Sequence, residues 1–154
     1  MQIVVLAVGK LKERHWREAE EEYRKRLLGY ASLSVEEVAA EPDEGSPDAI
    51  LAKEGRRLLA RVRDRDCLVA LERTGRRLDS EAFADCLRAC ADAGCGRWVF
   101  VVGGSRGLCE EVLARAQMRL SFSDLTFPHQ LARILLLEQI YRAFTIWRGT
   151  PYHK

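Results

Sequence analysis

The sequence predicts an α/β fold: a single domain over residues 1–154, with a mostly parallel sheet and helices on both faces. Segments with strand-like and helix-like patterns alternate along the chain, as they do in βαβ units. The strand-like segments are mostly continuous apolar runs, which is typical of strands buried on both faces. Apolar residues make up 47% and charged residues 31%, so the chain has the composition of a globular domain with a sizeable core.

The first half of the chain predicts two pairs of a strand and a helix. The apolar run QIVVLAV, residues 2–8, ends at Gly9 and indicates a buried strand. The acidic loop EPDEGSPD, residues 41–48, is too short to link two domains. We expect Asp48 to cap the helix that follows this loop. The expected elements are a strand at 2–8, a helix at 13–30, a weaker strand at 33–38 and a helix from Ala49 to about Arg63.

The second half continues the alternation. Asp79 or Ser80 is expected to cap its first helix, and Gly94 to end it. The glycine-rich turn Gly103-Gly104-Ser105-Arg106-Gly107 follows the strongest strand of the chain. The expected elements are strands at 66–72, 97–104 and 119–123, a turn at 73–78, and helices that run to Ala93 and over 108–117.

The last helix, from Leu131 to Trp147, contains no Gly or Pro, and Pro128 suits its first turn. Its apolar residues cover far more than one stripe, so we expect it to be buried nearly all round. A domain of this size has little interior for a whole helix. We therefore expect a second copy of the chain to cover part of it in a homodimer. A membrane span is disfavoured, because Arg133, Glu138, Gln139 and Arg142 interrupt the apolar run.

Charge and cysteine content limit the class of protein. A net charge of +2 permits a nucleic-acid partner without requiring one. The mixed-charge face of the 13–30 helix is interpreted as solvated, with RNA contact as the alternative. The first residues lack the basic region of a signal peptide, and the cysteine number is odd, so we expect free thiols and a cytoplasmic location. Cys86, Cys90 and Cys95 have no nearby His and are interpreted as buried thiols rather than metal ligands.

Three strand ends carry the candidate chemistry, because ligands bind at the carboxyl ends of strands in open α/β sheets. They are Leu71–Gly75, Gly103–Gly107 and Ser121–Phe127. The spacing G-G-x-x-G in the second lets backbone amides approach a ligand closely, although it is neither a P-loop nor G-x-G-x-x-G. We expect these segments to form a pocket made largely of backbone groups.

The histidines do not belong to any usual catalytic motif. His129, in the first turn of the last helix, is interpreted either as a structural residue or as part of the pocket. His153 lies one residue from the end of the chain, where side chains are usually disordered. Because His153 follows the most buried helix, we weigh a role in a functional site equally with disorder.

The turn GGSRG, the segment SDLTFPHQLARILLLEQIYRAF, the terminal PYHK and the N-terminal IVVLAVGK together resemble the large-subunit ribosomal RNA methyltransferase H family of the SPOUT superfamily. The resemblance covers essentially the whole chain and is most specific in residues 98–154. It implies S-adenosylmethionine as cofactor, a deep C-terminal trefoil knot and a homodimer. It also implies methylation of N3 of a pseudouridine in 23S ribosomal RNA, with the assembled ribosome as partner and no metal or membrane.

The same resemblance assigns residues to the site. The implied cofactor-binding residues are Leu71, Gly103, Phe122, Ser123, Asp124, Leu125, Thr126 and Phe127. It places the catalytic residues Arg142, Tyr152 and His153 beside the methyl donor, in their own or in the partner's site. Where an acid is often found in the glycine turn of the family, this chain has Ser105-Arg106, which suits contact with an RNA phosphate better than a carboxylate role.

The implied reaction depends on positioning, because a sulfonium methyl group is already electrophilic. His153, or a water that it orients, is expected to take the N3 proton, and Arg142 to stabilise the resulting charge. Two alternatives stay open: a SPOUT-like methyltransferase of another RNA, and a non-enzymatic ribosome- or RNA-binding module. The lack of an appended RNA-binding domain weighs against the first, and the glycine turn against the second. A small-molecule α/β enzyme would lack a recognisable nucleophile.

Overall fold

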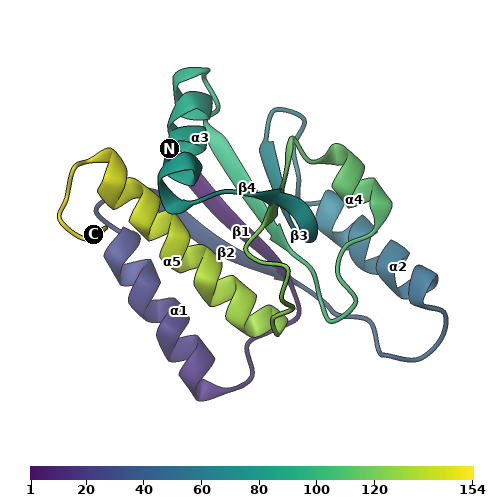
Figure 1. The fold of residues 1–154 in the computed structure, drawn as a ribbon. Helices are drawn as coiled ribbons and strands as arrows, with labels where there is room; N and C mark the ends of the chain where they lie inside the picture. The colour runs from purple at the N-terminus through teal and green to yellow at the C-terminus, as the bar shows by residue number, and fades with distance from the viewer.

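The computed structural model describes residues 1–154 and alternates strands with helices throughout (Figure 1). The elements are β1 (Gln2–Val8), α1 (Arg14–Leu27), β2 (Ser32–Val38), α2 (Pro47–Leu59), β3 (Cys67–Arg77), α3 (Ser80–Asp92), β4 (Arg97–Val102), α4 (Glu110–Arg115), β5 (Met118–Ser121) and α5 (His129–Trp147).

The strands form one sheet in the order β2-β1-β4-β3-β5, and every neighbouring pair is parallel. Helices α1, α3 and α5 cover one face, and α2 and α4 cover the other (Figure 1). Because a parallel sheet must be covered on both faces, this arrangement removes the apolar strands from water. The predicted α/β fold is confirmed.

Strand β1 shows why its sequence is a continuous apolar run. Ile3 and Val5 pack into the core beneath α1, α3 and α5, whereas Val4 and Leu6 pack into the core beneath α2 and α4. Successive side chains of a strand point to opposite faces, so a strand covered on both sides needs an apolar residue at every position.

Helix α2 differs from the prediction at both ends. Ser46, not Asp48, caps it: the Ser46 hydroxyl accepts from the N–H of Ala49 at 3.2 Å, and Pro47 takes the first helical position, where no N–H is needed. The helix ends at Leu59: the N–H of Ala60 still bonds to Arg56, four residues back, but those of Arg61 and Val62 bond three residues back, as in a 3₁₀ turn. In α3, Asp79 is the cap, so one of the two predicted residues is confirmed.

Strand β3 is longer than predicted, and the expected turn at 73–78 is wrong. After an irregularity that follows Leu71, Arg76 and Arg77 pair with Leu120 and Ser121 of β5. Gly75 allows this close pairing, since a Cβ there would lie 2.7 Å from the backbone of Arg119. The extension lies beyond the apolar core and is held by backbone pairing, so hydrophobic periodicity does not reveal it.

Helix α5 lies between α1 and α3, and none of its residues is fully exposed, in agreement with the prediction of a helix buried nearly all round (Figure 1). It begins at His129, with Pro128 as its N-cap residue. Several of its apolar residues are only half-buried, including Leu131, Ile134 and Leu135. No helix of the protein is long and apolar enough to cross a membrane.

Two of the cysteines differ from the expectation that all thiols are free. Cys67, at the start of β3, and Cys95, just before β4, are joined as a disulfide. The prediction of free thiols is therefore wrong for these two residues, because the parallel pairing of β3 and β4 brings their amino ends together. Cys86, Cys90 and Cys109 are free, and no group of side chains in the structure is arranged to hold a metal ion.

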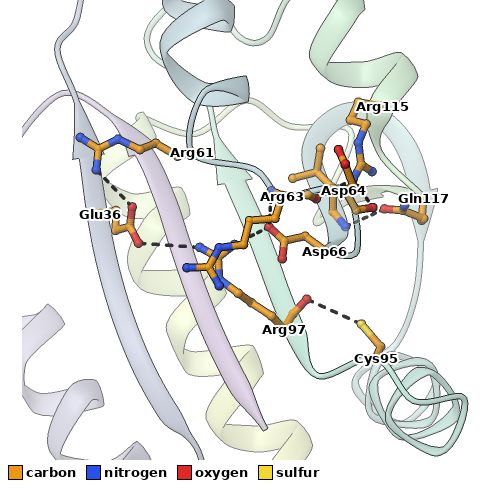
Figure 2. Close-up of polar contacts among 10 residues, drawn as sticks. Glu36, Arg61, Arg63, Asp64, Asp66, Cys95, Arg97, Arg115 and Gln117 are labelled. Carbon is orange, nitrogen blue, oxygen red and sulfur yellow. Dashed lines mark hydrogen bonds and ion pairs between the residues drawn. The ribbon is translucent and has the colours of Figure 1, made fainter.

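Charged residues at the amino ends of β3 and β4 bind one another (Figure 2). The buried carboxylate of Asp66 accepts from the N–H of Arg63 at 2.7 Å and pairs with Arg97. Arg97 also lies 3.9 Å from Glu36, which is 3.7 Å from Arg61. These ion pairs link the segments at this end of the sheet, opposite the carboxyl ends of β3 and β4.

Candidate functional site

A cavity of about 230 Å³ opens at the carboxyl ends of β3, β4 and β5. All three strand ends selected from the sequence contribute to it. Of the predicted cofactor residues, the lining contains Leu71, Gly103, Phe122, Ser123, Leu125, Thr126 and Phe127. Asp124 is the exception: its exposed side chain turns outward and pairs with Arg77 at 2.6 Å. The expected pocket is therefore present, and both apolar and polar residues line it.

The glycine turn forms one wall of this cavity. The N–H of Gly107 donates to the carbonyl of Gly104 at 3.1 Å, which closes the turn. A Cβ on Gly103 would lie 2.5 Å from the carbonyl oxygen of Gly107, and Gly107 has a φ of +83°. Both positions therefore require glycine for the backbone to turn this tightly.

The segment after β5 forms the opposite wall and is tied to β3. The Ser121 hydroxyl lies 2.8 Å from the carbonyl of Arg73 and 3.1 Å from that of Ser123, and these two acceptors share its single proton. The Ser123 hydroxyl accepts from the N–H of Leu125 at 3.0 Å. These bonds shape an irregular loop that presents its backbone to the cavity.

His129 lines the cavity at the start of α5, which resolves the alternative left open by the sequence in favour of the pocket. Burial lowers the pKa of His129, and Arg133 lowers it further, while Glu13 and Glu54 act in the opposite direction. The imidazole is therefore neutral near pH 7.

Arg133 holds the start of α5 against the sheet. Its guanidinium donates to the carbonyl of Gly9 at 2.9 Å and to Glu37 at 2.6 Å, and it lies 3.3 Å from Glu20. The side chain is only 1% exposed. Sequence reasoning missed this role, although a charged residue inside an otherwise apolar buried helix signals a partner elsewhere in the fold.

The three predicted catalytic residues form a separate cluster at the other end of α5. Glu138 accepts from Arg142 at 2.5 Å and from the hydroxyl of Tyr152 at 3.1 Å. The Arg142 guanidinium lies over the Tyr152 ring, 4.7 Å from its centroid, and 3.3 Å from Nδ1 of His153. Nε2 of His153 is 3.8 Å from Glu81. The terminal tail is thus packed against α5.

This cluster does not reach the cavity of its own chain. None of Arg142, Tyr152 and His153 lines it. Because a helix rises about 1.5 Å per residue, His129 and Arg142 lie about 20 Å apart along α5. The structure therefore brings the predicted site residues together as two groups.

A parallel α/β domain with a glycine-walled pocket at the carboxyl ends of its strands has the architecture of a ligand-binding α/β domain. Residues 1–153 match the family model described as "Predicted SPOUT methyltransferase". The chain belongs to this family of methyltransferases, whose members typically use S-adenosylmethionine.

A solved structure supports the same architecture. The chain is similar to a probable methylase family protein from Haemophilus influenzae Rd KW20, with 15% identity and a TM-score of 0.54. The match covers 99% of this chain and 70% of the other. At this identity the likeness shows a shared fold.

Proposed function

We propose that this protein transfers a methyl group from S-adenosylmethionine to N3 of a pseudouridine in 23S ribosomal RNA of the assembled ribosome. The observation that carries the proposal is the convergence of three strand ends, distant in sequence, on one cavity. The resemblance in residues 98–154 supports the choice of substrate. A ribosomal substrate places the activity in the cytoplasm, and the proposal includes the deep trefoil knot that the family resemblance implies.

The cavity fits this cofactor chemically. Leu71, Phe122 and Phe127 offer apolar surface for a flat purine ring. The glycine turn and the loop after β5 offer backbone N–H and carbonyl groups for its polar edges. Leu71, Gly103 and the segment 122–127 would hold the cofactor, with Asp124 contributing through its backbone because its side chain points outward. When bound, the cofactor supplies an electrophilic methyl group.

The proposal includes a homodimer in which the tail of one chain serves the partner's cavity. Within one chain, the Arg142 cluster and the cavity are about 20 Å apart along α5, which disfavours a site formed in cis. The half-buried apolar residues of α5 supply a surface for the second chain: Leu131, Ile134, Leu135, Ile146 and Trp147.

Arg142 and His153 have complementary parts in this proposal. Arginine can only donate, so Nδ1 of His153 accepts from it, and the neutral ring carries its proton on Nε2. His153 therefore has no free lone pair while this bond is made. When Arg142 turns from His153 toward the pyrimidine, Nδ1 becomes free to accept the N3 proton, and the guanidinium then faces the negative charge left on the ring. Arg142 then stabilises charge, and His153 acts as the base.

Transfer of radiolabelled methyl from S-adenosylmethionine tests the proposal. The substrates are assembled ribosomes from cells lacking the enzyme, isolated large subunits, naked ribosomal RNA and transfer RNA. We expect label only in the assembled ribosome, at a pseudouridine. Label in transfer RNA would instead support the alternative RNA substrate. An absence of label in every substrate, with no cofactor binding by calorimetry, would return the chain to the class of binding modules.

A further inference from the structure

A second, smaller cavity of about 90 Å³ lies on the other side of the glycine turn. It is formed by the end of β1, the loop after β2 and one face of α2. Gly104, Ser105 and His129 line both this cavity and the larger one, so the two are neighbours that share a wall.

Glu54 of α2 places a carboxylate in this small cavity. The residue is only 5% exposed. One oxygen, Oε1, accepts from the N–H of Glu41 at 3.0 Å. The other, Oε2, makes no hydrogen bond within the protein and lies 3.5 Å from where a Cβ of residue 104 would be. The absence of a side chain at Gly104 thus leaves this oxygen open toward the turn.

The cations near Glu54 are occupied elsewhere. Lys53 and Arg57 both pair with Glu41, and Arg106 pairs with Asp43 at 2.5 Å. His129 is neutral near pH 7, because its burial and the adjacent Arg133 lower its pKa. No ion pair joins Glu54 to any side chain of the protein. The N–H of Glu41 is the only hydrogen-bond donor to Glu54, so Oε2 is free to accept from a cationic ligand.

We propose that Glu54 binds the α-ammonium group of the methionine part of S-adenosylmethionine, in the cavity behind Gly104. This inference rests on the proposed cofactor. The cofactor carries a permanent sulfonium charge and an ammonium group, whereas a pyrimidine substrate is neutral. Of the two cations, the ammonium is the one with N–H donors, and a carboxylate oxygen with free lone pairs is its natural acceptor. The adenosine part then occupies the larger cavity, and the amino-acid part reaches past the glycine turn.

Calorimetry with two ligands and one isosteric variant tests this assignment. S-adenosylhomocysteine has the ammonium group, and 5′-methylthioadenosine lacks the whole amino-acid part. Glu54→Gln keeps an oxygen for the N–H of Glu41 while removing the charge. We expect the variant to bind S-adenosylhomocysteine at least about tenfold more weakly and to bind 5′-methylthioadenosine as the wild type does.

Glu36→Gln is the matched control. It also removes one negative charge, but from a carboxylate that lines neither cavity and lies near two cationic partners, Arg61 and Arg97. We expect unchanged affinity for both ligands. Equal weakening of both ligands by Glu54→Gln would overturn the inference in favour of a structural role, and an unchanged affinity for S-adenosylhomocysteine would overturn it directly.

A second binding experiment uses the wild-type protein, so its result does not depend on whether the variant folds. S-adenosylhomocysteine without its amino group must bind at least about tenfold more weakly than the parent compound, and equal affinity would overturn the inference. Such a result would leave the cofactor assignment intact. Wild-type protein that binds none of the adenosine ligands would instead overturn the proposed function and this inference together.

Discussion

The structural roles of some charged residues in this protein depend on partners that lie far away in the sequence. Arg133 joins α5 to the end of β1 through Gly9 and to β2 through Glu37. Its burial means that these donors have no water to replace a lost partner. By contrast, Arg14 pairs with Glu18 on the surface of α1, where both side chains are mostly exposed.

Replacing Arg133 by Met should lower the free energy of unfolding by about 2–4 kcal/mol, because it leaves the carbonyl of Gly9 and the carboxylate of Glu37 without their donor, whereas Glu20 keeps Arg24. Arg14→Met, the same change at the exposed pair, should alter it by less than about 0.5 kcal/mol. Urea denaturation of both variants measures the difference. A similar small effect at both positions would show that the Arg133 network contributes little to stability.

At the scale of elements, the close packing of α4 against α2 depends on Gly55 of α2. A Cβ on Gly55 would collide with Sγ of Cys109, the N-cap residue of α4. The missing side chain lets the start of α4 approach α2 closely, and α2 also carries Glu54.

Gly55→Ala should destabilise the protein by about 1–3 kcal/mol through overpacking, although alanine favours a helix by about 1 kcal/mol. Adding Cys109→Ala removes the colliding sulfur and should restore most of the loss. Gly29→Ala is the control, because a Cβ there meets no atom within 4 Å. Chemical denaturation of the single and double variants gives the coupling energy. A double variant that is no more stable than Gly55→Ala would refute the role of this contact.

At the scale of the whole molecule, the two groups of predicted site residues lie at opposite ends of α5. The cavity lies beside His129, and the Arg142 cluster lies beside the terminal tail. The helix keeps them apart within one chain, which is why the proposed site combines residues from two chains of a symmetric dimer.

Mixed dimers distinguish a tail that acts in the partner's site from one that acts in its own. Ser123→Trp fills the cavity, and His153→Ala removes the proposed base, so each variant alone should be inactive on ribosomes. In a statistical mixture, half of the dimers contain one of each chain and one complete site out of two, so activity should return to about a quarter of the wild-type value. Methyl transfer to ribosomes is measured for each variant alone and for the two variants co-expressed, and the recovered activity is compared with that of the wild type. No recovery in purified mixed dimers would contradict a site formed by both chains.

The sequence patterns predicted which helices and strands form more accurately than they predicted where these elements begin and end. The apolar run of β1 and the breadth of apolar residues in α5 are local features, and both elements formed as predicted. The extension of β3 and the disulfide between Cys67 and Cys95 depend on which strands become neighbours. Strand order has no local signature, so these two features were not foreseen.

The features of the candidate site also fall into two groups: those that the sequence predicted and those that only the tertiary structure shows. Local glycine spacing and the irregular segment before Pro128 marked two walls of the larger cavity, and the family motifs marked its residues. The sequence by itself thus determined the α/β class and the three strand ends that carry the pocket. Only the tertiary structure decided that Glu54 and His129 line one cavity behind Gly104, that Arg133 supports the start of α5, and that the tail lies away from its own cavity. The reason is physical: hydrophobic periodicity reports which face of an element is buried, whereas contacts between distant residues depend on strand order and helix packing, which no local pattern contains.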